Sequence, residues 1–93
     1  MTNIKDLLNQ IIKMLKESSN FSQAEWIENQ LLSLDDDSEN TIKNIKAVIA
    51  GMGSLSDLYL TIPQSSSHNK SEYNMAYQEL VRKLDYEIQE YLK

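Results

Sequence analysis

The helical pattern of this chain is interrupted at residues 51–60, Gly-Met-Gly-Ser-Leu-Ser-Asp-Leu-Tyr-Leu. Both glycines of the protein lie in this stretch, and its single proline follows three residues later. Because glycine adopts the left-handed conformation without a Cβ penalty, we expect Gly51 to end one helix and Gly53 to let the chain turn again. Ser54 can cap a short helical turn, with Asp57 in the capping-box position. The stretch therefore predicts a buried, Gly-rich corner in a helical protein.

The first helix is predicted over about residues 4–17, where apolar side chains recur at positions i, i+3, i+4 and i+7. Asn3 is its expected N-cap. The polar residues Ser18, Ser19 and Asn20 then break the pattern. A connection this short normally joins antiparallel neighbours, so the first two helices should form a hairpin.

The second helix is expected to begin with a capping box, in which Ser22 is the N-cap and Glu25 is the third helical residue. Phe21 and Trp26 have the spacing of a hydrophobic staple on either side of that start. A half-buried Trp26 with a structural role follows from this arrangement.

Two further helices are predicted over about residues 41–50 and 70–92, on either side of the corner. Asp37 or Ser38 is the expected N-cap of the third helix, and Asn69 that of the last. The apolar stripe of the last helix continues for about six turns, which makes it the longest element. The chain is thus predicted to be an all-α single domain over residues 1–93, a small bundle of about four helices with a Gly-rich corner and a long C-terminal helix.

Composition narrows the classes of function. The chain has 93 residues, no cysteine and a net charge of −5. Cysteine-based metal sites and disulfides are therefore excluded. The sequence starts without a secretory signal pattern and has no apolar run of the roughly 20 residues that a membrane span needs. These features predict a cytoplasmic protein that does not associate with membranes.

The side chains do not combine into a catalytic or metal-binding motif. The single histidine, His68, lies in a Ser-rich stretch, and general-base catalysis needs a positioned partner. The acidic run from residue 35 resembles the start of a calcium loop, but Asn40 and Lys46 occupy the positions that require glycine and glutamate. Ser54 lacks the strand-turn-helix context of a nucleophile elbow. We therefore expect no enzyme activity, no catalytic residues, no cofactor and no metal site.

The acidic residues are concentrated in one segment. Residues 19–40 contain six carboxylates and no lysine or arginine; the carboxylates are Glu25, Glu28, Asp35, Asp36, Asp37 and Glu39. Direct binding of nucleic acid is disfavoured, because phosphate contacts require a basic face. A basic protein partner is favoured, although a charged face can also serve solubility alone.

Tyr73 and Tyr77 form a second candidate surface for a partner. They lie one turn apart near the start of the last helix, and tyrosine is enriched at interface hot spots. Aromatic residues at helical spacing more often pack in a core, so core packing is the favoured interpretation for both residues and binding the alternative.

Residues 51–58 resemble the Gly-Met-Gly-Ser-x-x-Asp-Leu signature of a family of small bacterial helical proteins. Those proteins are similar to immunity proteins of polymorphic toxin and contact-dependent growth inhibition systems. The family usually has a second glycine before the signature, where this chain has Ala50. The resemblance implies a protein that binds and neutralises a cognate toxin, most often a basic nuclease. The alternative is a small adaptor or regulatory protein that uses the same surface on a partner that is not a toxin.

Overall fold

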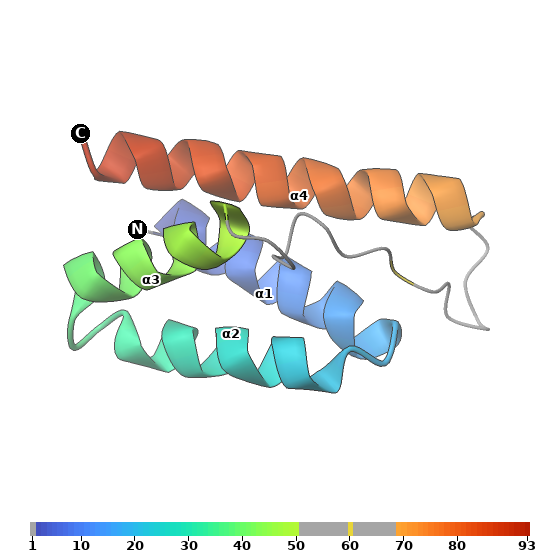
Figure 1. Cartoon of the computed structure of the whole chain (residues 1–93), viewed down its shortest axis with the longest axis horizontal. Coiled ribbons are helices and arrows are strands. Elements are labelled where there is room, and N and C mark those ends of the chain that lie inside the picture. Colours follow the sequence, from blue (N-terminus) through green and yellow to red (C-terminus); the bar gives the residue numbers. More distant parts are fainter. Residues whose placement is uncertain (1, 51–59, 61–68) are drawn as a thin grey trace.

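The structure is a computed structural model, and it describes residues 2–50, 60 and 69–93. These residues form the α-helices α1 (Thr2–Glu17), α2 (Phe21–Ser33), α3 (Ser38–Ala50) and α4 (Lys70–Tyr91). The described ranges contain no strand, so the predicted all-α fold is confirmed. Figure 1 shows α4, with 22 residues the longest helix, lying along one side of the bundle above the other three.

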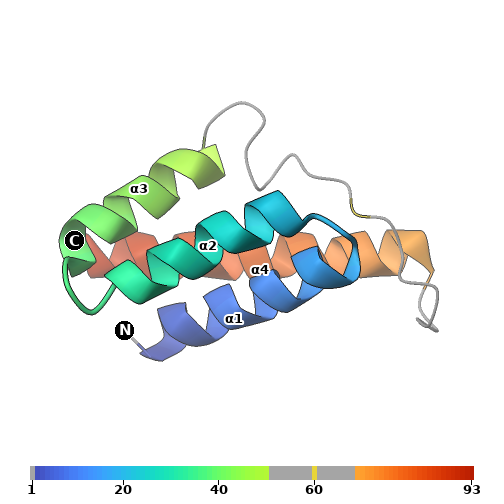
Figure 2. The same cartoon turned by 90° about the horizontal axis from the view of Figure 1, so that it is seen from below.

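Helix α1 makes the most extensive contacts of the bundle, with α2 and α4. Helix α3 contacts the same two helices less extensively. Figure 2 shows α1 and α2 side by side and antiparallel, as the short connection between them predicted. The apolar stripe of α1 explains these extensive contacts, because Ile4, Leu8 and Leu15 are all buried at helical spacing. Each such side chain contributes about 1.5–3 kcal/mol by leaving water.

The α1–α2 connection differs from the prediction. Ser19 has a left-handed backbone with φ 65°. The Asn20 N–H donates to the Leu15 carbonyl (2.7 Å) and the Ser19 N–H to the Lys16 carbonyl (3.1 Å). These two bonds form a Schellman motif, in which Ser19 holds the position that glycine usually takes. The motif brings the chain into α2 two residues earlier than the capping box implied.

As a result, the predicted cap and staple of the second helix are wrong. Asn20 is the N-cap of α2, its carbonyl accepts from the Ala24 N–H (3.1 Å), and its side chain makes no capping bond. Ser22 therefore lies inside the helix. Phe21 is the first helical residue and is exposed, so it does not pack as a staple on Trp26. Trp26 is half-buried against the core, as expected.

The start of α1 is also earlier than predicted. The helix includes Thr2, so Asn3 lies within it and is not the N-cap. The N-caps of the two later helices are confirmed. The Asp37 carboxylate accepts from the Asn40 N–H (3.4 Å) just before α3, and the Asn69 side chain accepts from the Glu72 N–H (2.8 Å) at the start of α4.

Leu60 is a described residue between α3 and α4, and it is hydrogen-bonded to α4. This residue is fully buried, and its backbone pairs with the buried side chain of Asn74 on α4. The Leu60 N–H donates to Asn74 Oδ1 (2.6 Å), and Asn74 Nδ2 donates to the Leu60 carbonyl (2.9 Å). The structural roles predicted for Gly51, Gly53, Ser54 and Asp57 lie outside the described residues.

Candidate protein-binding surface

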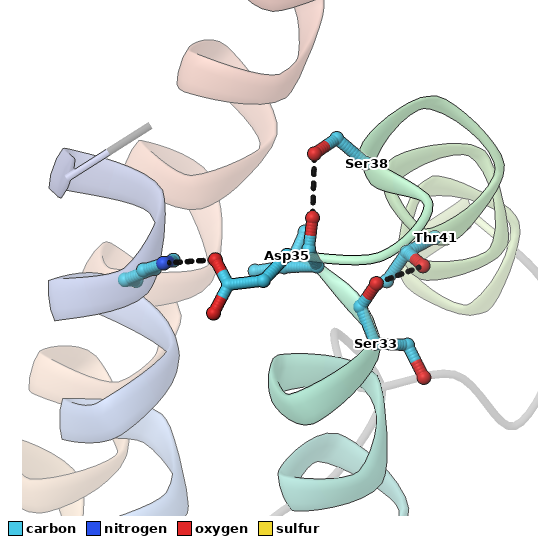
Figure 3. Close-up of polar contacts among 6 residues, drawn as sticks. Ser33, Asp35, Ser38 and Thr41 are labelled. Carbon is cyan, nitrogen blue, oxygen red and sulfur yellow. Dashed lines mark hydrogen bonds and ion pairs between the residues drawn. The ribbon is translucent and has the colours of Figure 1, made fainter.

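The turn between α2 and α3 carries the most concentrated acidic side chains, and Figure 3 shows how it is held. The Asp35 carboxylate accepts from the Lys5 ammonium of α1, with 2.6 Å between Oδ1 and Nζ. The Ser38 hydroxyl donates to the Leu34 carbonyl (2.5 Å), and the Thr41 hydroxyl donates to the Ser33 carbonyl (3.4 Å). The turn is therefore attached to α1, α2 and α3, which limits the directions in which its carboxylates can point.

Three of the six predicted carboxylates make ion pairs with lysines that lie outside the acidic segment, residues 19–40. Besides Lys5–Asp35, Lys16 of α1 lies 2.7 Å from Glu28, and Lys43 of α3 lies 3.1 Å from Glu39. The run without a basic residue in sequence is thus interrupted in space. Exposed pairs of this kind contribute only about 0–1 kcal/mol to stability, so they orient the carboxylates more than they stabilise the fold.

The other three carboxylates, which form no ion pair with a described residue, differ in how freely they can contact a cationic group of a partner. Glu25 and Asp36 are exposed, and neither forms an ion pair with any described residue. Asp37 is also exposed, but its carboxylate accepts from the Asn40 side chain (2.8 Å) as well as capping α3. Glu25 and Asp36 are consequently the carboxylates that most readily meet an external cation.

Tyr73 and Tyr77 do not form a binding surface, and this alternative from the sequence is wrong. Both side chains are buried in the core between α4 and the other helices. The Tyr73 hydroxyl lies 3.0 Å from Glu17 Oε1 and 3.3 Å from the Met14 carbonyl oxygen, which joins α4 to the end of α1. Burial, and then the adjacent Glu17 carboxylate, raise the pKa of Tyr73 to about 12. Burial alone raises the pKa of Tyr77.

An open groove of 530 Å3 lies between α1 and α4. Its lining mixes Asp6 and Glu87 with Arg82 and Lys83, beside Leu7 and Tyr86. Because the lining contains both acidic and basic side chains, the groove does not favour an anionic ligand over a cationic one. Among the described residues, no three acidic or histidine side chains gather as a metal site, and no described helix is long and apolar enough to cross a membrane.

Comparison with known proteins adds no relative. No family model, no curated protein and no solved structure matches the chain.

Proposed function

We propose that this protein is an immunity protein that binds and neutralises a cognate bacterial toxin, with a basic nuclease as the class of toxin that its charge fits. The observation that carries the proposal is the acidic segment of α2 and the α2–α3 turn. It presents Glu25 on α2 and Asp36 on the α2–α3 turn, both without an ion pair among the described residues, and the turn is held by hydrogen bonds and by the Lys5–Asp35 pair.

Electrostatics give the reason for this choice of partner. A nuclease must carry a basic surface to hold its phosphate backbone. A fixed set of carboxylates can bind the same cations and exclude the nucleic acid. Complementary charge also steers the two proteins together, which raises the association rate above the roughly 10⁵–10⁶ M⁻¹s⁻¹ of neutral pairs. Pre-oriented side chains lose less conformational entropy when the complex forms.

The experiment is a protection assay. The C-terminal domain of the protein encoded next to this gene is induced in a bacterial host, with and without this chain. We expect growth to be rescued by the wild-type chain and lost with Glu25→Lys/Asp36→Lys. Asp6→Lys/Glu90→Lys makes the same change in net charge outside the acidic segment and should still protect.

Two results would contradict the proposal. The neighbouring domain could arrest growth whether or not this chain is present, with no complex detectable by calorimetry. Alternatively, a complex could form with a domain that has no toxicity, and this result would favour the adaptor function.

A further inference from the structure

Helix α2 presents two large apolar side chains to solvent. Phe21 is 62% exposed and Leu32 is 75% exposed. They are 11 residues apart, which is close to three turns, so they lie on the same face about 16 Å from one another. The inner face of the helix is formed by Ala24, Ile27 and the adjoining Leu34, all buried. Phe21 and Leu32 are therefore not needed by the core of this bundle.

Carboxylates lie between and beside these two side chains. Glu25 follows Phe21 by one turn, and Glu28 precedes Leu32 by one turn, so all four share the outward face of α2. Glu28 is held by Lys16 at 2.7 Å, whereas Glu25 makes no ion pair with the described residues. Asp36 lies four residues after Leu32, in the turn that follows the end of α2, and it is also exposed. Single exposed apolar residues are common on protein surfaces. Here two large apolar side chains lie on one face of a helix with carboxylates between them, which is an arrangement that can contact a partner.

We propose that this outward face of α2, the face that carries Phe21, Glu25, Glu28 and Leu32, is the surface that docks on the partner. Its occupant is a basic protein surface with two apolar depressions about 16 Å apart and lysine or arginine side chains between them. The inference rests on the proposed function and names the helix that performs it. Apolar anchors surrounded by charge are the usual arrangement of an interface hot spot.

The charge of the face argues against a second copy of this chain as the occupant. Two α2 helices packed face to face would place the Glu25 side chains of both copies, which form no ion pair with a described residue, in one contact, whereas Glu28 is paired with Lys16, and the whole chain already has a net charge of −5. Like charges placed opposite one another destabilise a contact. A basic partner would place opposite charges across the contact, and this electrostatic interaction is favourable.

Helix α4 supplies a matched control. Met75 is 69% exposed and Tyr86 is 61% exposed, and they are also 11 residues apart on one helical face. Between them lie Glu79 and Arg82, which pair with each other, so that face has no net negative charge. The two helices thus carry similar exposed apolar groups in different electrostatic surroundings.

The test compares Phe21→Ser/Leu32→Ser with Met75→Ser/Tyr86→Ser, using the C-terminal domain of the neighbouring gene's product as the probe. Isothermal titration calorimetry should show a Kd at least about 100-fold weaker for the α2 double variant and within about threefold of wild type for the α4 variant. Thermal unfolding by circular dichroism checks that both variants remain folded. Equal losses for both variants, or a loss confined to the α4 variant, would overturn the inference.

Failure of the proposed function gives a different result. If wild-type protein does not bind the neighbouring domain, that function is wrong, and the surface is tested with displayed fragments of the source genome. A sequenced, basic fragment that binds wild type and the α4 variant but not the α2 variant supports the inference. Selected fragments that bind the α2 variant equally well, or the absence of any fragment that depends on α2, overturn it.

Discussion

Replacing Asn74 by alanine should destabilise the bundle strongly, although this residue is polar and lies on α4, outside the proposed interface on α2. Its side chain satisfies both the N–H and the carbonyl of Leu60, and all these groups are buried. Alanine removes both partners at once. Each buried backbone group left without a partner costs about 1–3 kcal/mol, so we expect a loss of about 2–6 kcal/mol for the two groups. This is a large share of the about 5–10 kcal/mol that holds a domain of this size together.

Urea unfolding followed by far-UV circular dichroism measures this loss, with Asn9→Ala on the exposed side of α1 as the control. Asn74→Asp separates the two hydrogen bonds, because an aspartate can still accept from the Leu60 N–H but an ionised one cannot donate to the carbonyl. It should therefore remain destabilised at neutral pH. An unfolding free energy for Asn74→Ala within about 0.5 kcal/mol of wild type would refute the reasoning.

Three further variants test other parts of the fold by the same unfolding assay. Ser19→Gly should stabilise by about 0.5–1 kcal/mol, because glycine removes the Cβ penalty at φ 65°; a loss of stability would contradict the Schellman assignment. Asp37→Ala should cost about 1 kcal/mol through loss of the α3 cap, while Asp36→Ala should change little; equal effects would contradict that assignment. Because the pKa of Tyr73 is raised from 10.0 to about 12, its stabilisation is complete below pH 10 and is lost as pH rises through that interval. Tyr73→Phe should reduce this decline between about pH 10 and pH 12 and leave the part that Tyr77 contributes, and an unchanged slope would exclude Tyr73 as a source.

Local signals in the sequence predict much of this fold. The apolar periods of α1 and α4 give nearly the observed helices, and Asp37 and Asn69 cap the helices that they precede. Each signal depends on residues within one or two turns, so no knowledge of tertiary structure is needed. The start of α2 is different. The left-handed Ser19 ends α1 and starts α2 early, and a serine gives no warning of that conformation.

The sequence predicts the candidate site only in part, because the ion pairs and the burial of its side chains depend on how the helices pack. The lysines that pair with Glu28 and Asp35 come from α1, which packs beside α2 only after folding. The inward direction of Tyr77 also depends on how α4 lies across the bundle, because α4 carries apolar groups on its exposed face as well. The exposed Phe21 and Leu32 are 11 residues apart in the sequence, which is close to three helical turns. This spacing is the sequence signal that could have predicted the outward face of α2.

The most direct test of the proposed function is the rate at which this protein associates with the C-terminal domain of the neighbouring gene's product, measured by stopped-flow at low and high salt. Wild type should associate fast at about 0.05 M salt and much more slowly at about 0.5 M, because the Debye length shortens with ionic strength. Glu25→Gln/Asp36→Asn should be slower at low salt with a shallower salt dependence, whereas Asp6→Asn/Glu90→Gln should match wild type. Equal rates and equal salt slopes for all three proteins would mean that the acidic segment of α2 and its turn does not meet the partner.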